Sequence, residues 1–231
     1  FENVGFRYAD DLPWVLQGVS LTIPKGARVG FIGATGGGKS TLLDILMGLL
    51  SATEGCLTVD GLTVSKKNGR AWQAHIAHVP QSIFLTDASV AENIAFGVPL
   101  HLIDHQRVRL AAKKAQIADS IETWSRGYET MVGERGVRLS GGQRQRIGIA
   151  RALYKTANVI VFDEATSALD SSTERAVMDS IEGLDQELTI IMVAHRLSTL
   201  RECSQIVELA GGKIKRVGSY QEIIGSADSA S

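Results

Sequence analysis

The chain has few cysteines, no long hydrophobic run and almost no net charge. Cys56 and Cys203 are the two cysteines in 231 residues, too few and too scattered for a disulfide framework or a thiolate metal site, so a reducing compartment is expected. No apolar run approaches the roughly 20 residues that a membrane helix needs. The 24 basic and 25 acidic residues give a formal net charge of −1, which argues against a nucleic-acid partner or an anionic membrane surface.

An initiator methionine and a signal peptide are also missing, because the chain opens at Phe1. This start predicts a segment of a longer polypeptide. The length suits one large α/β domain or two tightly joined lobes, and 44% hydrophobic residues can fill a core.

A glycine-rich loop follows the apolar segment Val29–Ile32. Residues 33–40 read Gly-Ala-Thr-Gly-Gly-Gly-Lys-Ser, which fits the pattern G-x-x-x-x-G-K-[ST]. Glycines let successive backbone N–H groups turn inward around a phosphate, and a helix beginning near Lys39 favours the same anion at its N-terminus. Lys39 is expected to reach the β- and γ-phosphates, and the Ser40 hydroxyl to bind Mg²⁺. The predicted nucleotide contacts of this loop are Gly33, Thr35, Gly36, Gly37, Gly38, Lys39, Ser40 and Thr41.

Two carboxylates end a hydrophobic strand pattern at residues 159–164, Val-Ile-Val-Phe-Asp-Glu. Asp163 suits a second oxygen ligand for the magnesium. Glu164 lies one residue further, past the carboxyl end of the strand, and is the better candidate for the base that orients and deprotonates the attacking water.

The pentapeptide Leu-Ser-Gly-Gly-Gln at residues 139–143 predicts a second anion site. Ser140 can cap a helix over 141–154, and the glycines that follow bare its backbone at the positive end of the helix dipole. The spacing alone does not forbid the two phosphate sites from meeting within one chain. The predicted contacts of this site are Ser140, Gly141, Gly142 and Gln143.

The remaining pattern predicts an α/β fold. Alternating residues over 1–23 indicate antiparallel strands, and Asp60-Gly61 predicts the turn of a hairpin over 56–64. Residues 82–156 read as helical, including a helix over 104–121 with apolar residues on one face. Further elements are expected as a strand at 76–80, a helix near 171–184, a strand at 188–194, a hairpin turning at Gly211-Gly212 and a flexible tail.

In this order, the phosphate loop, the pentapeptide and the acidic strand end resemble the nucleotide-binding domain of an ABC ATPase, from about Phe1 to Gly225. The resemblance implies ATP and Mg²⁺ as cofactors. It also implies a P-loop ATPase core with an antiparallel β-subdomain (1–81 and 157–225), an inserted helical signature subdomain (82–156) and a tail (226–231).

Further residues match the family pattern. Tyr8 resembles the aromatic residue that stacks on adenine; the alternative is an ordinary strand tyrosine. Gln81 resembles the glutamine that senses magnesium and the lytic water, and His195 the histidine that contacts the γ-phosphate. The loop ending at Asp170 resembles one that links two sites, and Asp170 can also cap a helix. Gly37 departs from the pattern, because serine or cysteine is commoner there, so no side-chain contact is expected from it.

The family also implies partners. The pentapeptide of one subunit covers the γ-phosphate held by the loop of another, which implies an ATP-dependent head-to-tail dimer. Residues 132–136 and 91–94 resemble exporter-type domains, which implies a transmembrane domain of the same or a partner polypeptide and a place on the cytoplasmic face of a membrane. The alternatives are a soluble ABC ATPase of DNA repair, chromosome organisation or translation, for which no coiled coil or second domain is present, and a module that binds ATP without hydrolysing it.

Overall fold

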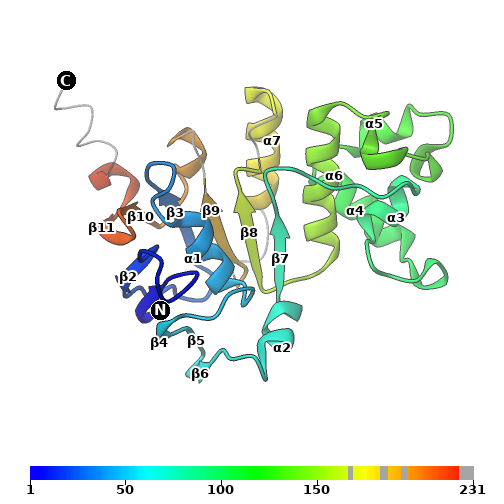
Figure 1. The fold of residues 1–231 in the computed structure, drawn as a ribbon. Helices are drawn as coiled ribbons and strands as arrows, with labels where there is room; N and C mark the ends of the chain where they lie inside the picture. The colour runs from blue at the N-terminus through cyan, green and yellow to red at the C-terminus, as the bar shows by residue number, and fades with distance from the viewer. Residues whose placement is uncertain (166–168, 183–186, 194–196, 224–231) are drawn as a thin grey trace. The chain divides into compact units, whose positions relative to one another are not determined.

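A mixed β-sheet carries the phosphate loop. The computed structural model describes residues 1–165, 169–182, 187–193 and 197–223. Within these residues the larger sheet has six strands in the order β11-β10-β3-β9-β8-β7. Neighbouring strands from β10 to β8 are parallel, β11 is antiparallel to β10, and Figure 1 shows β3, β9 and β8 side by side. The strands are β3 (Arg28–Ile32), β7 (Ile76–Val79), β8 (Val159–Asp163), β9 (Thr189–Val193), β10 (Gln205–Ala210) and β11 (Lys213–Gly218).

A second, antiparallel sheet has the strand order β2-β1-β4, and its strands β1 and β2 are the antiparallel pair that the alternation over 1–23 predicted. Its strands are β1 (Glu2–Phe6), β2 (Leu16–Val19) and β4 (Glu54–Cys56). A hairpin of β5 (Thr58–Val59) and β6 (Leu62–Thr63) follows. Asp60 and Gly61 at its turn have φ of 49° and 79°, the positive values that a two-residue hairpin turn requires.

The helix after the phosphate loop, α1 (Lys39–Leu46), packs into the main hydrophobic core. Its buried Leu42, Leu43 and Ile45 belong to one cluster with strand residues such as Phe31 and Val161. Burying a leucine or isoleucine side chain contributes about 1.5–3 kcal/mol, so this face fixes the helix, and with it the loop, to the sheet.

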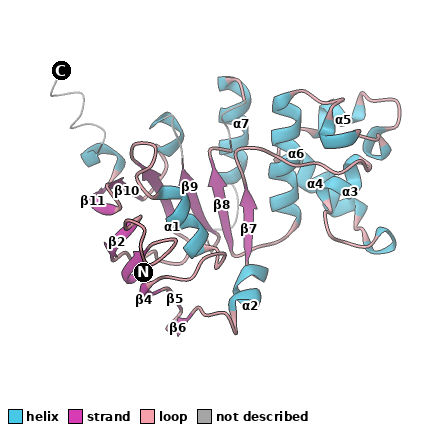
Figure 2. Cartoon of the chain, viewed as in Figure 1, coloured by secondary structure: helices cyan, strands magenta, loops and turns pink. Residues whose placement is uncertain are grey.

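Helices make up most of residues 90–154, and no strand lies among them in Figure 2. This part confirms that helices dominate the predicted range 82–156, although residues 82–89 are not helical. Its elements are α3 (Val90–Ile94), η1 (Leu100–Leu102), α4 (His105–Lys114), α5 (Ala118–Glu122), η2 (Gly127–Glu129), η3 (Glu134–Gly136) and α6 (Gly141–Tyr154). Elsewhere lie α2 (Gly69–Ala74), α7 (Ser171–Glu182) and η4 (Leu197–Leu200).

The single helix predicted over 104–121 is wrong. Asp104 caps α4 by accepting hydrogen bonds from the backbone N–H groups of Gln106 and Arg107, but α4 ends at Lys114. Gln116 has a φ of 56°, a left-handed conformation that stops the helix before α5 begins. The break turns Ile117 into the core, where its side chain is fully buried.

Contacts divide the described chain into two compact units. The first unit holds residues 1–76, 158–163, 187–193 and 197–223, and the second holds 77–157, 164–165 and 169–182. The extent of the signature subdomain, predicted as 82–156, stays a prediction, and the tail at 226–231 lies outside the described residues. Among the described residues, no helix is both long enough and apolar enough to cross a bilayer.

Candidate functional site

Three glycines of the phosphate loop, Gly33, Gly36 and Gly38, stand where another residue would be strained or would clash. A Cβ atom on Gly33 would lie 2.1 Å from the carbonyl oxygen of Leu209, and φ at Gly33 is 142°. A Cβ on Gly38, whose φ is 96°, would lie 2.7 Å from the Leu16 side chain. At Gly36 the space is open, but φ is 79°. The conformation of this loop therefore depends on glycine at these positions, as a backbone cradle for phosphate requires.

Lys39 folds back over the loop. Its Nζ donates hydrogen bonds to the carbonyl oxygens of Gly33 at 2.7 Å and Ala34 at 3.1 Å. Gly38 is the N-cap of α1 and supplies no side-chain cap, and the first turn of α1 holds no acidic residue. The backbone N–H groups of this turn and the lysine ammonium therefore form a positive site suited to an anion.

Asp163 lies at the same edge of the sheet as the phosphate loop. Asp163 of β8 and Phe31 of β3 both align with Val193 of β9, the strand between them. Adjacent strands lie about 4.8 Å apart, so Asp163 is about 10 Å across the sheet from Phe31, two residues before Gly33. The carboxylate and the Ser40 hydroxyl are oxygen donors of the kind that magnesium prefers.

Glu164, the next residue, is hydrogen-bonded to Gln81. Nε2 of Gln81 donates to Oε2 of Glu164 at 2.6 Å, and the two residues are 83 apart in the chain. Glu164 has a φ of 52°, in the left-handed region that a residue other than glycine seldom adopts. The two residues assigned to water activation therefore contact each other.

Tyr8 lies beside the first turn of α1. Its hydroxyl is 3.4 Å from Oγ1 of Thr41, and its ring packs edge-to-face on Phe6 with centroids 4.9 Å apart. The residue is nevertheless 62% exposed. A ring held at the phosphate loop with much of its surface in solvent agrees with the predicted adenine platform, which stays a prediction.

The pentapeptide begins helix α6 with a capping box. Oγ of Ser140 accepts from the backbone N–H of Gln143, and the backbone N–H of Ser140 donates to Oε1 of Gln143. The helix spans Gly141–Tyr154, as predicted, and its first turn has no acidic residue. This arrangement satisfies two backbone donors and leaves the helix end suited to an anion.

Asp170 caps helix α7, which agrees with one of the two interpretations of this residue. Hydrogen bonds from Ser172 and Thr173 hold the pKa of the Asp170 carboxyl well below its usual range. A communicating role for Asp170 is untested. Its neighbours Ser167 and Ala168, and the predicted γ-phosphate contact His195, lie outside the described residues.

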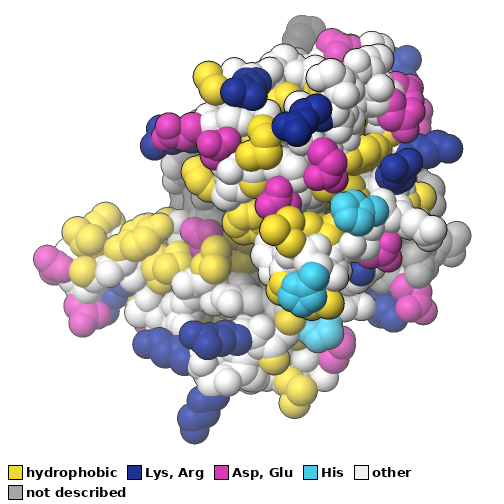
Figure 3. Space-filling view, turned by 90° about the vertical axis from the view of Figure 1, so that its right-hand side faces the viewer, with side chains coloured by type: hydrophobic (Ala, Val, Ile, Leu, Met, Phe, Trp, Pro, Cys, Tyr) yellow, Lys and Arg dark blue, Asp and Glu magenta, His cyan; other side chains and the backbone are white. Residues whose placement is uncertain are grey.

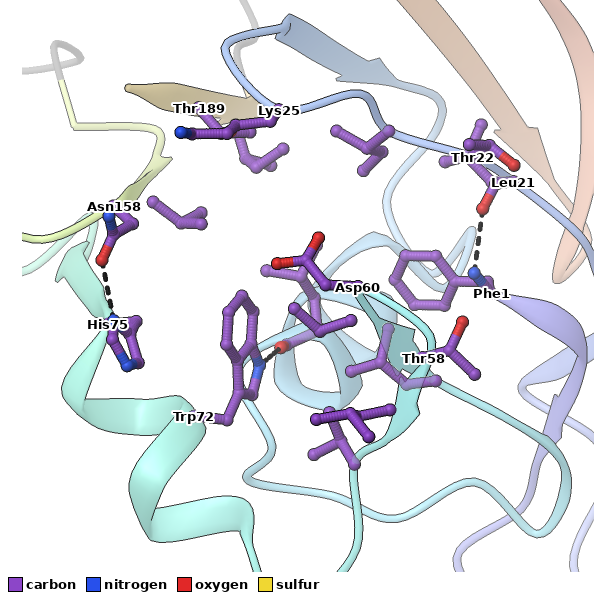
Figure 4. A pocket seen from close by; sticks show the side chains of 18 of the residues that line it. Phe1, Leu21, Thr22, Lys25, Thr58, Asp60, Trp72, His75, Asn158 and Thr189 are labelled. Atoms are coloured by element: carbon purple, nitrogen blue, oxygen red, sulfur yellow. Dashed lines mark hydrogen bonds between the residues drawn. The ribbon is translucent and has the colours of Figure 1, made fainter. Parts of the chain in front are cut away.

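A cavity of about 820 Å³ lies away from these residues, between the antiparallel strands and the start of the parallel ones. Val159 and Thr189 in its wall open β8 and β9, so the cavity is at the opposite end of the strands from Asp163. Figure 4 shows the Trp72 indole in this wall, where it donates to the Leu46 carbonyl. The phosphate loop does not line it.

A family model agrees with this geometry. Residues 16–167, which include the phosphate loop, the pentapeptide and the acidic strand end, match the family described as ABC transporter. This chain belongs to the ABC transporter family. Its predicted fold class, an α/β P-loop ATPase core with an antiparallel β-sheet and a helical part, is thereby confirmed, as is the prediction of an ATPase domain.

Relatives of this ABC domain are longer proteins. It is 42% identical over 226 residues to the ATP-dependent lipid A-core flippase of Cupriavidus metallidurans, covering 97% of this chain and 38% of the flippase. It is 41% identical to ATP-binding cassette sub-family B member 6 of Rattus norvegicus, covering 97% of this chain and 26% of that protein. The chain therefore spans less than two fifths of the length of these relatives.

A solved structure shares the fold. The structure of a bacterial Atm1-family ABC exporter with ATP bound superimposes with a TM-score of 0.92 at 36% identity. The match covers 98% of this ABC domain and 39% of the exporter chain. An ABC exporter is therefore among the solved structures that this domain resembles.

Sequence reasoning missed two arrangements in the second unit. The direct bond between Gln81 and Glu164 has no signal in the sequence, because the two residues lie on separate segments. The start of helix α3 does have a signal in the sequence. Ser89 and Glu92 form a capping box, and a serine followed three residues later by a glutamate can be recognised from the sequence alone.

Proposed function

We propose that this ABC domain binds Mg-ATP and hydrolyses it to drive export or flipping of a substrate through a transmembrane domain. The observation that carries the proposal is the placement of the phosphate loop and Asp163 at one edge of the sheet. In parallel α/β sheets, ligands bind outside the carboxyl ends of the strands, where both groups lie.

Each residue of the site has its own role in binding or hydrolysing ATP. Backbone N–H groups of the loop and Lys39 bind the phosphates, and Tyr8 stacks on the adenine. Ser40, Asp163 and Gln81 would hold a magnesium ion, which would offset the phosphate charge. Glu164 accepts a proton from the attacking water at its carboxylate, and His195 is assigned to the γ-phosphate.

The pentapeptide serves the nucleotide of a second copy. Ser140, Gly141 and Gly142 expose a capped helix end suited to phosphate, and this end belongs to a different compact unit from the loop around Lys39. Two copies closing head to tail around two ATP molecules would complete both sites by symmetry. Asp170, beyond the strand end, is assigned to communication between them.

The names of the relatives and the apolar surface support a transmembrane partner. The flippase and the Atm1-family exporter are named for transport, so we assign this domain to the cytoplasmic face of a membrane. The second unit exposes large apolar side chains, among them Phe84 at 59%, Leu100 at 69% and Val137 at 76%. Figure 3 shows apolar side chains at the surface between scattered acidic and basic ones, a surface that suits protein contact better than nucleic acid.

Substitution of the base tests the proposal. Glu164→Gln removes the proton acceptor but leaves the phosphate and magnesium contacts, so ATP affinity should stay close to wild type while kcat falls by about 10²-fold or more. Calorimetry and steady-state phosphate release measure the two quantities. Glu129→Gln makes the same chemical change at an exposed residue elsewhere and should leave both unchanged. Hydrolysis by Glu164→Gln within a few-fold of wild type would remove Glu164 from the role.

A further inference from the structure

We infer that Gln81 is a positioning residue for Glu164, holding the carboxylate through its side-chain amide before any nucleotide binds. This inference rests on the proposed function, because it takes Glu164 as the base. The positioning bond uses Nε2 of Gln81, whereas a magnesium contact from Gln81 would use the oxygen of the same side-chain amide. One side chain would thus connect the metal to the base.

The bond between the two side chains is short and charge-assisted. Nε2 of Gln81 lies 2.6 Å from Oε2 of Glu164, below the usual range for an N–H donor and an oxygen acceptor. Hydrogen bonds to an ionised carboxylate are about twice as strong as those between neutral groups. The amide therefore fixes the direction of the Glu164 carboxylate rather than merely touching it.

The backbone of Glu164 does not favour its own conformation. A φ of 52° costs a residue with a Cβ atom about 1–2 kcal/mol, so the conformation needs support from its surroundings. The side-chain bond from Gln81 is one such support, and strained backbone of this kind is common at catalytic groups.

Gln81 can act as a support because the segment after it is anchored to α6. Nη1 of Arg151 donates to the carbonyl oxygen of Phe84 at 3.0 Å, and its Nε donates to the carbonyl oxygen of Asn93. Ile83 packs so closely on α6 that a Cβ at Gly148 would lie 2.4 Å from its Cδ1. Pro80 precedes Gln81 and restricts the chain on the other side.

The first test needs no nucleotide and no turnover. In ¹⁵N-labelled protein, the side-chain amide signals of Gln81 are identified as those lost in Gln81→Glu. Glu164→Ala should move these signals upfield toward those of a solvent-exposed glutamine, because the carboxylate acceptor is gone. Glu129→Ala, which removes an exposed carboxylate from η2, should not move them. Gln81 signals that stay in place in Glu164→Ala would overturn the inference.

The second test separates the amide nitrogen from the metal-binding oxygen. Gln81→Glu keeps the length and an oxygen ligand but replaces the donor by a second carboxylate. We expect Gln81→Glu to lower kcat by about ten- to a hundredfold with KM for Mg-ATP within about twofold of wild type, and Gln81→Ala, which also loses the oxygen ligand, to lower kcat by at least as much. If the metal were the only partner of Gln81, Gln81→Glu would turn over close to the wild-type rate.

A double-mutant cycle completes the test. In a Glu164→Gln background, Gln81→Ala should lower the residual rate by clearly less than it lowers the wild-type rate, because only its magnesium contact is left to lose. Full additivity of the two substitutions would contradict a positioning role. Failure of the base assignment would be seen separately, as hydrolysis retained by Glu164→Gln alone. The amide signals of Gln81 report its contact with Glu164 in either case.

Discussion

The hydroxyl of Tyr8 lies 3.4 Å from Oγ1 of Thr41, so the loop after β1 is tied to the first turn of the helix that follows the phosphate loop. The contact joins residues 33 apart in sequence and brings an aromatic ring to the place where phosphate is expected to bind. Thr41 is buried and Tyr8 is exposed, so the threonine anchors a ring that remains open to a ligand.

Two substitutions at Tyr8 separate its ring from its hydroxyl. Tyr8→Ala should weaken ATP binding by about 1–3 kcal/mol, the range for loss of a base stacked on an aromatic side chain. Tyr8→Phe loses only the contact with Thr41 and should weaken ATP binding by no more than about 0.5–1.5 kcal/mol. Calorimetry with ATP and GTP measures both, and selectivity between the purines should hardly change. Unaltered ATP and GTP affinities in Tyr8→Ala would show that Tyr8 is an ordinary strand residue and not the adenine platform.

Lys39→Ala should weaken nucleotide binding itself, in contrast to Glu164→Gln. The ammonium now held by the carbonyl oxygens of Gly33 and Ala34 would contact ground-state phosphates, and losing a hydrogen bond to a charged group costs about 1.5–3 kcal/mol. Lys25→Ala is a matched control, because Lys25 is paired with Glu187 at the surface of the same unit. An ATP affinity in Lys39→Ala equal to that of the Lys25→Ala control would exclude Lys39 from the site.

Two glycines of the phosphate loop should differ in what alanine does to stability. Gly33→Ala places a methyl group 2.1 Å from the Leu209 carbonyl oxygen, so we expect unfolding free energy to fall by about 3 kcal/mol or more. Gly36→Ala meets no atom within 4 Å and should cost about 1–2 kcal/mol, from its positive φ alone. Urea denaturation measures both. Equal losses would mean that the loop relaxes away from β10 at Gly33.

The fold was predictable where local signals agree with tertiary packing. Helix α6 spans the predicted residues, and its start could be predicted because the capping-box residues Ser140 and Gln143 precede its apolar positions in the sequence. The prediction of one helix over 104–121 was wrong because the chain leaves the helical conformation at Gln116, and glutamine is not a residue type that ends helices. Burial of Ala115 and Ile117 on either side sets that bend, and burial is a property of the folded chain.

The site was predictable as a set of residues but not as a set of contacts. The loop around Lys39 and the strand end at Asp163 have local patterns, and the parallel register aligns Asp163 with the strand that leads into the loop. The bond from Gln81 to Glu164 joins distant segments and depends on the backbone conformation of Glu164, which no sequence pattern indicates.

The last prediction concerns assembly. In a Glu164→Gln background with Mg-ATP, this domain should dimerise, because unhydrolysed nucleotide bridges two copies, whereas with ADP or no nucleotide it should be mostly monomeric. Adding Ser140→Arg should abolish the dimer, since a bulky side chain would occupy the helix end that meets the partner's phosphate. ATP binding to the monomer should persist, because Ser140 is not part of its own subunit's Lys39 site. Sedimentation velocity with a parallel nucleotide titration measures both quantities.

The cap at Ser140 makes a second variant necessary. Oγ of Ser140 accepts a bond from the backbone N–H of Gln143, so Ser140→Arg also removes the cap, which costs helix stability about 1 kcal/mol. Ser140→Ala removes the same cap without added bulk, and it should weaken the ATP-dependent dimer while Ser140→Arg eliminates it. Equal unfolding free energies for the two variants would show that the difference in dimerisation comes from the blocked helix end. A Ser140→Arg, Glu164→Gln protein that still dimerises with ATP, or a Ser140→Arg monomer unable to bind ATP, would refute the composite site.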